Sequence, residues 1–193
     1  ARLSGRKGAL DFDSELMIQR GAFGADDIRA LGGTIDIGWR FADAPLAPRV
    51  GGRFTYGSGD ADLGDDTQGT FAPPFPNSQW FGQNGLASFS NTVETAALMA
   101  LTPAEHVTVN LKLSSVWRSE TADFAYAGNT ALAGTSGGDD AFVGRAAAIS
   151  LAWRPNDNVL INPYLSYVAV GDDLLSRGAH DVTYTHLSVT LRF

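Results

Sequence analysis

The sequence predicts an all-β fold, an antiparallel transmembrane β-barrel, from three observations. Eight segments alternate apolar and polar side chains with a period of two, the pattern of a strand with one apolar face. Each has about 10 to 13 residues, whereas strands of soluble sheets have about five or six, and a tilted strand needs about 10 to cross a bilayer. The connections alternate between short and long, as in outer-membrane barrels.

We expect strands at residues 9–20, 30–41, 48–59, 92–102, 106–118, 142–154, 159–170 and about 181–193. The first sets Leu10 and Phe12 against Asp11 and Asp13, two sets that a helix with a period of 3.6 would not separate. The second and third carry aliphatic and aromatic side chains on one parity and Asp, Arg or Thr on the other.

The remaining five strands follow the same rule with fewer charges. The fourth opposes Met99 and Leu101 to Glu94 and small residues, and the fifth opposes valines, leucines and Trp117 to polar residues such as Lys112. The sixth and seventh place Gly, Ala, Ser and Asn on the polar parity, and the seventh also places Tyr164 there. The eighth ends in HLSVTLRF, which alternates up to its last residue. We therefore expect it to be the last strand of this chain.

The order of connections predicts the topology. Short links such as TPAEH and RPNDN alternate with long ones, of which the segment between the third and fourth strands is the longest. Short turns face the periplasm in outer-membrane barrels, so we expect both termini there and one domain or barrel half over residues 1–193. Because the chain begins at Ala1 rather than Met, we expect a processed or truncated product.

Aromatic side chains on the apolar parity favour a membrane over the alternative, a soluble antiparallel sandwich. They lie near strand ends, as expected for membrane-interface girdles. The residues are Trp39, Trp117, Trp153, Tyr56, Tyr167 and the terminal Phe193. A sandwich also has period-two strands, but it does not need strands of this length or loops sorted by length.

If the apolar parity faces lipid, the polar parity faces a lumen. The expected lumenal charges are Asp11, Asp13, Glu15, Asp36, Arg40, Arg49, Arg53, Glu94, Lys112, Arg118 and Arg192. Such charges need water or one another. One interpretation is structural ion pairs between neighbouring strands, and the other is that Arg49, Arg53, Lys112 and Arg118 attract an anionic solute.

Four segments of the chain carry a family likeness. They are GALDFDSELMIQRGAFG, PRVGGRFTYGSGDAD, GTFAPPFPNSQWFG and the closing YTHLSVTLRF, with SGD followed by GTF, FP and FG as the most specific part. Together they resemble the alginate export family of bacterial outer-membrane barrels. The resemblance implies a barrel of about eighteen strands, of which this chain matches the C-terminal half. It also implies an arginine-lined pore for an anionic polyuronate, with Arg49 and Arg53 on the arginine-bearing strand.

The strand count leaves three arrangements open. The chain is a fragment of a larger pore, or it assembles with another chain, or it closes as an eight-stranded barrel too narrow for a hydrated polysaccharide. Two functions follow: an outer-membrane channel, or part of one, for alginate or a similar acidic solute, and a non-transporting barrel that acts as a structural or surface-binding module. The expected partners are outer-membrane lipid and lipopolysaccharide, and the barrel-assembly machinery through the terminal strand.

Several other classes of function are disfavoured. A net charge of −7 without a basic stripe argues against nucleic acid, and the absence of cysteine excludes thiol chemistry. His186 and Ser188 share a face but project side by side rather than as a nucleophile with its base, so we expect no enzyme and no cofactor. The acidic loop Asp60–Asp66 lacks EF-hand spacing and is expected to be solvated or to bridge divalent ions to lipopolysaccharide.

Overall fold

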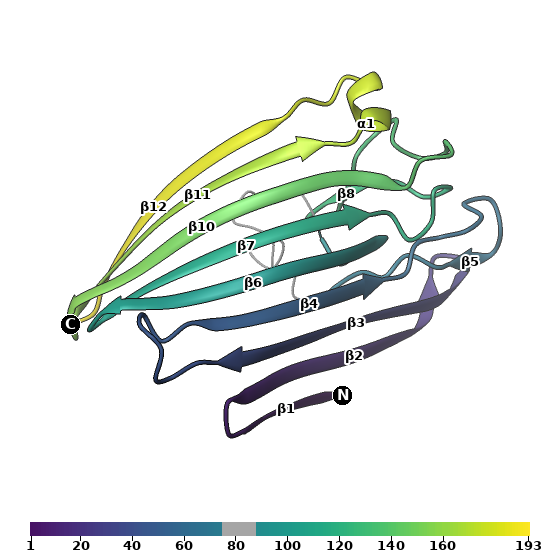
Figure 1. Cartoon of the computed structure of the whole chain (residues 1–193). Helices are drawn as coiled ribbons and strands as arrows, with labels where there is room; N and C mark the ends of the chain where they lie inside the picture. The colour runs from purple at the N-terminus through teal and green to yellow at the C-terminus, as the bar shows by residue number, and fades with distance from the viewer. Residues whose placement is uncertain (75–87) are drawn as a thin grey trace.

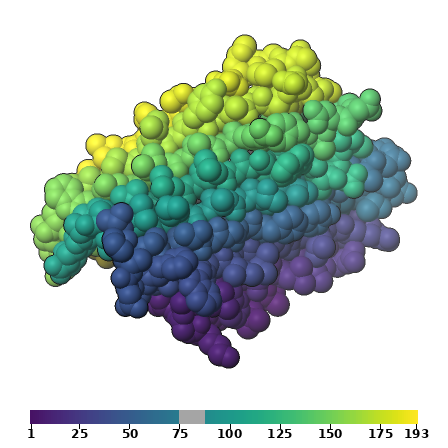
Figure 2. Space-filling view, in the orientation of Figure 1, coloured from purple at the N-terminus to yellow at the C-terminus, as the bar shows by residue number. Residues whose placement is uncertain are grey.

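The computed structural model describes residues 1–74 and 88–193, whose strands form a curved antiparallel sheet (Figure 1). The elements are β1 (Arg2–Lys7), β2 (Leu10–Phe23), β3 (Asp26–Arg40), β4 (Arg49–Gly57), β5 (Thr67–Gln68), β6 (Thr92–Ala104), β7 (Val107–Trp117), β8 (Tyr126–Ala127), β9 (Thr130–Ala131), β10 (Phe142–Asn156), β11 (Val159–Val170), α1 (Asp172–Ser176) and β12 (Val182–Leu191). The main sheet has the order β1-β2-β3-β4-β6-β7-β10-β11-β12, with β5 paired in parallel to β3. Figure 2 shows these strands side by side in chain order, from purple to yellow. The all-β antiparallel fold is confirmed.

The eight predicted strands are β2, β3, β4, β6, β7, β10, β11 and β12. β1 was not predicted; it pairs with β2 from Arg2 opposite Glu15 to Lys7 opposite Leu10. Its sequence, RLSGRK, offers Leu3 as its one large apolar side chain, so the alternation is too sparse to be recognised. In the described part of the chain, no helix is long and apolar enough to cross a membrane.

Short turns and long loops lie at opposite ends of the sheet (Figure 1). The turns between β1 and β2, β6 and β7, and β10 and β11 share one end with the C-terminus. The connections after β4, β7 and β11 lie at the other end, where the tight β2–β3 hairpin is the exception. Ala1 lies midway along β2, where its carbonyl accepts a hydrogen bond from the N–H of Leu16 at 2.8 Å.

The two faces of the sheet have opposite chemistry. The outer face carries exposed aliphatic and aromatic side chains, among them Leu31, Ile35, Ile37, Val50, Phe54, Leu113, Ile149, Leu165, Leu187 and Val189. The inner face carries buried polar side chains, including Asp36, Thr55, Glu94, Ser114 and Ser166. An apolar face of this extent requires apolar surroundings, which a bilayer supplies to the outer face of a membrane barrel.

The two edge strands of the sheet are β1 and β12. Within residues 1–74 and 88–193 no pairing joins them, and β2 pairs with β1 and β3 rather than with β12. Closure of the first predicted strand onto the eighth, one of the three arrangements that the strand count left open, is therefore absent from the described residues, because β1 occupies that edge of β2.

The outer face generates a stability prediction. Leu113, the seventh of eleven residues in β7, has a relative exposure of 63% on the outer face. Replacing it with arginine places a charge in the hydrocarbon region, and we expect Leu113→Arg to lower the free energy of unfolding by about 2–4 kcal/mol. The measurement is denaturant unfolding of protein folded into lipid vesicles.

The matched control for this prediction is Asn110→Arg. Asn110 lies on the same strand, and it is an exposed residue of the inner face. We expect it to change the free energy of unfolding much less than Leu113→Arg does. Equal effects of the two substitutions would contradict the assignment of the faces.

Candidate functional site

The charged residues of β2, β3 and β4 lie in matching register on the inner face. Asp13 on β2 lies opposite Asp36 on β3, and Asp36 lies opposite Arg53 on β4. Two carboxylates directly opposite each other are unfavourable unless cations lie beside them. The neighbouring strands supply these cations.

Arg49 reaches across a whole strand to meet this need. It lies opposite Arg40 in the β3–β4 register, yet its Nε donates to Asp11 Oδ1 on β2 at 2.8 Å and its Nη2 to Asp36 Oδ1 on β3 at 2.7 Å. The guanidinium lies over Gly38, where a Cβ atom would be 2.2 Å from Arg49 Cζ. Glycine at this position lets the side chain lie flat on the sheet.

Further ion pairs extend this arrangement into what we call the charge ladder. Arg53 Nη2 donates to Asp36 Oδ2 at 2.9 Å, and Arg2 Nη2 on β1 donates to Asp13 Oδ2 at 2.5 Å. The charge ladder comprises Arg2, Asp11, Asp13, Asp36, Arg40, Arg49 and Arg53. Sequence reasoning named all of these except Arg2, which it missed because β1 was not recognised. Glu15 lies on the same face of β2 as Asp11 and Asp13, opposite Arg2 of β1.

Lys112 and Glu94 form a separate pair on β7 and β6. Lys112 Nζ lies 2.6 Å from Glu94 Oε1, and the Glu94 side chain is fully buried. Removing one partner from a buried ion pair leaves an uncompensated charge, which is strongly destabilising. This pair therefore holds the inner face together beside the charge ladder.

A groove of about 580 Å³ lies along the inner face between these two groups. Asp36, Arg49, Arg53 and Lys112 are among the residues that line it on the charged side. Asn110, Ser150 and Tyr164 add neutral polar groups, and apolar side chains line the rest, namely Leu98, Met99, Ala100, Leu111 and Ala148. A groove with several cations and neutral hydrogen-bonding groups is suited to an acidic, hydroxyl-rich solute.

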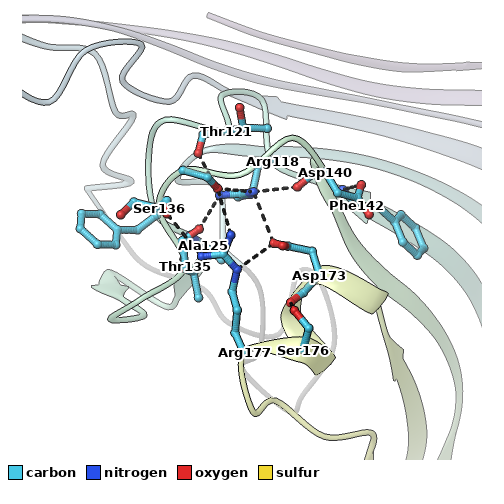
Figure 3. A network of polar contacts seen from close by, with 12 residues as sticks. Arg118, Thr121, Ala125, Thr135, Ser136, Asp140, Phe142, Asp173, Ser176 and Arg177 are labelled. Carbon is cyan, nitrogen blue, oxygen red and sulfur yellow. Dashed lines mark hydrogen bonds and ion pairs between the residues drawn. The ribbon is translucent and has the colours of Figure 1, made fainter.

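Arg118 does not join the groove. Its side chain is 2% exposed, and its guanidinium donates to the carbonyls of loop residues that follow β7, with Asp173 of α1 nearby (Figure 3). The distances are 3.0 Å to Thr121, 3.1 Å to Asp123, 2.5 Å to Thr135, 3.2 Å to Gly137 and 2.7 Å to Asp140. A guanidinium surrounded in this way cannot contact a solute, so its place in the structure is that of a loop anchor.

Asp123 is a second centre of the loops at this end. Its carboxylate accepts hydrogen bonds from the Asp60 N–H at 3.1 Å, the Thr70 hydroxyl at 2.6 Å and the Tyr126 hydroxyl at 2.9 Å. Burial, with the Asp123 carboxylate beside it, raises the pKa of Tyr126 to about 12. Asp123 thus ties the loop after β4 to the loop after β7.

The SGD motif, Ser58 to Asp60, folds the loop after β4 back onto the sheet. Ser58 accepts a hydrogen bond at Oγ from the Leu31 N–H at 2.9 Å, and its hydroxyl donates to the Gly69 carbonyl at 2.7 Å. This brings the buried ring of Phe71 against Gly32 of β3, where a Cβ atom would be 2.7 Å from the ring. The FP and FG parts of the family-like motif, at residues 75–76 and 81–82, lie outside the described residues.

The acidic loop Asp60–Asp66 uses its carboxylates locally. Asp60 accepts from the N–H of Asp62 at 3.1 Å, Asp62 from that of Gly64 at 3.0 Å, and Asp65 from that of Thr67 at 2.7 Å. Among residues 1–74 and 88–193, no group of His, Asp or Glu side chains is arranged to hold a metal ion. His186 and Ser188 lie on the inner face of β12, two residues apart.

Five of the predicted interface aromatics lie on the outer parity of their strands, in two bands, and the sixth, Phe193, lies beyond β12. Trp39 and Trp153 lie near the short-turn end, as does Phe193 at the C-terminus. Trp117, Tyr56 and Tyr167 lie near the long-loop end. Trp117 packs against Phe142 with ring centroids 5.7 Å apart. Arg192 lies beyond β12 at the short-turn end, where its N–H donates to the Asn158 carbonyl at 2.8 Å.

The Arg118 network generates a prediction about loop stability. Arg118→Lys keeps the charge but removes the planar fork, so buried carbonyls lose donors at a cost of about 1–3 kcal/mol each. We expect limited proteolysis between residues 118 and 141 to be at least about tenfold faster, while the strands stay intact.

The control for this prediction is Arg154→Lys, an exposed residue at the opposite end of the sheet. It is expected to leave the cleavage rate of the loops unchanged. Wild-type cleavage rates in Arg118→Lys would show that the loops do not depend on this residue.

Comparison with known proteins agrees with this architecture and with the resemblance noted in the sequence. The family model described as alginate export matches residues 1–187 of the chain. A search of curated proteins found no match. The family model covers nearly the whole chain, including every strand of the charge ladder, and the chain therefore belongs to the alginate export family.

Proposed function

We propose that this chain forms part of the wall of an outer-membrane channel that exports an anionic polysaccharide, alginate or a similar acidic solute. The observation that carries the proposal is the inner groove, where Arg49, Arg53 and Lys112 lie together behind an apolar outer face. Membership of the alginate export family supports polysaccharide export as the class of function.

The charge ladder suggests how a polyanion would move. Arg49 is held by Asp11 and Asp36 through Nε and Nη2, and its Nη1 lies over Gly51 without a hydrogen bond to any described residue. A passing carboxylate can bind this remaining donor while the carboxylates of the ladder keep the guanidinium in place. Sites that are already partly neutralised bind weakly, and weak, repeated binding is what conduction requires.

We infer that further strands complete the wall. The outward edges of β1 and β12 pair with no described strand, and an unpaired backbone group in lipid costs several kcal/mol. Completion by more strands, to about the eighteen implied by the family resemblance, gives the groove an opposite wall and room for a hydrated polymer.

The membrane setting follows from the two faces. The apolar outer face contacts lipid, and the two bands of aromatic side chains mark its interfaces. The short-turn end, with the C-terminus, faces the periplasm, while the long loops meet lipopolysaccharide outside. The terminal aromatic strand is the segment that the barrel-assembly machinery would bind.

Ion selectivity tests the proposed function. The double variant Arg49→Glu with Arg53→Glu changes the net charge of the inner face by −4, because each substitution replaces a charge of +1 with one of −1. We expect the reversal potential in a salt gradient across a planar bilayer to shift towards cation preference, since fixed charges set the sign of the permeating ion.

Two further variants sharpen this test. Gly38→Ala displaces the Arg49 guanidinium without changing charge, and a smaller shift of the same sign is expected. Arg29→Glu alters an exposed outer residue of β3 and is expected to have no effect. An unchanged reversal potential in the double variant would remove these arginines from the mechanism. No current from wild-type protein whose wall is completed by the further strands would favour the non-transporting barrel instead.

A further inference from the structure

Tyr164 is an unusual residue of the inner face. It lies on β11 with 9% exposure, and its buried hydroxyl has no hydrogen-bond partner in the described part of the chain. Burying a hydroxyl without a partner is unfavourable, and phenylalanine would pack equally well without that cost. The hydroxyl is therefore better explained by a ligand than by packing of the wall.

Tyr164 belongs to an aromatic cluster that spans the last two strands. Its ring lies 6.1 Å from the ring of Tyr184 on β12 at an angle of 63°, and Tyr184 lies 6.4 Å from the ring of His186. In register, Tyr164 is opposite His186. We call Tyr164, Tyr184 and His186 the aromatic cluster.

Tyr164 lines the same groove as Arg49, Arg53 and Lys112. The groove therefore has a cationic side on β4 and β7 and an aromatic side on β11, with Asn110 and Ser150 between them. Its ligand should combine an anionic group, several hydroxyl groups and an apolar face.

A pyranose ring that carries a carboxylate has all three features. Its carboxylate suits a guanidinium or an ammonium group, and its C–H face suits the negatively polarised face of an aromatic ring. Its hydroxyl groups can supply the partner that the Tyr164 hydroxyl lacks. A nucleotide would also stack on a ring, but the carboxylates of Asp13 and Asp36 in the groove disfavour its multiply charged phosphates.

We propose that Tyr164, which lines the groove, and Tyr184, which packs beside it, form a sugar-binding subsite in which a uronic acid ring lies against the aromatic cluster while its carboxylate points to the cationic side. This inference rests on the proposed function, because it assigns the ring-recognition element of the same groove. The subsite gives the solute a neutral contact in the groove. Because this contact does not depend on ion pairing, binding at the subsite should persist at high salt.

Calorimetric titration of the detergent-purified protein with alginate hexasaccharides tests the subsite. Tyr164→Phe keeps the ring and removes the hydroxyl, so we expect Kd to rise about three- to tenfold. Tyr184→Leu removes a stacking ring, and we expect a rise of about tenfold. Tyr167→Phe, the same change on the outer face of β11, should leave Kd unchanged. Retained strand content by circular dichroism establishes that each variant is folded.

The outcomes separate this inference from the proposed function. Unchanged Kd in Tyr164→Phe and Tyr184→Leu, or no binding by the wild-type protein, would overturn the subsite. If the two variants bind more weakly while wild-type protein in the completed barrel carries no current, the subsite stands and the channel proposal fails. Unchanged Kd together with anion-selective current would leave the channel without this subsite.

Discussion

Every charged side chain on the inner face must find either a partner or water, and the structure follows from that constraint. The period of two places Asp11, Asp13 and Asp36 on one face of adjacent strands, where their repulsion would separate β2 from β3. Arg49 resolves this by crossing β3 over Gly38 and binding carboxylates of both strands. Three strands are thereby joined by one side chain as well as by their backbone ladders.

The same constraint relates the strands to function. Guanidinium groups fixed by carboxylates on neighbouring strands are pre-organised. Binding of a solute therefore costs little conformational entropy of these side chains. The groove also has neutral hydroxyl and amide groups and apolar side chains, and Tyr164 of the aromatic cluster lines it. At the long-loop end, Arg118 and Asp123 hold the loops by hydrogen bonds among themselves rather than by contacts with the groove.

The sequence predicted the strands and their faces well, because a period of two is visible in each strand without knowledge of its neighbours. It could not predict which residues pair. Asp11 meets Arg49 two strands away only because of the register and the glycine between them. Arg118 continues the alternation of β7 and so looked lumenal, but the strand ends at Trp117 and the side chain turns into the loops. Tyr164 was read as a polar-parity residue, and nothing in the sequence signals that its hydroxyl lacks a partner.

The proposed channel requires that one face of the sheet meets water and the other meets lipid. The chain has no cysteine, so single cysteines can be introduced along β7 and β10 and treated in intact outer membranes with a charged, water-soluble thiol reagent. We expect cysteines at the inner positions Asn110 and Ser150 to react and those at the outer positions Leu111, Leu113 and Ile149 to be protected. Equal reactivity on both faces, or protection of the inner positions alone, would contradict the account.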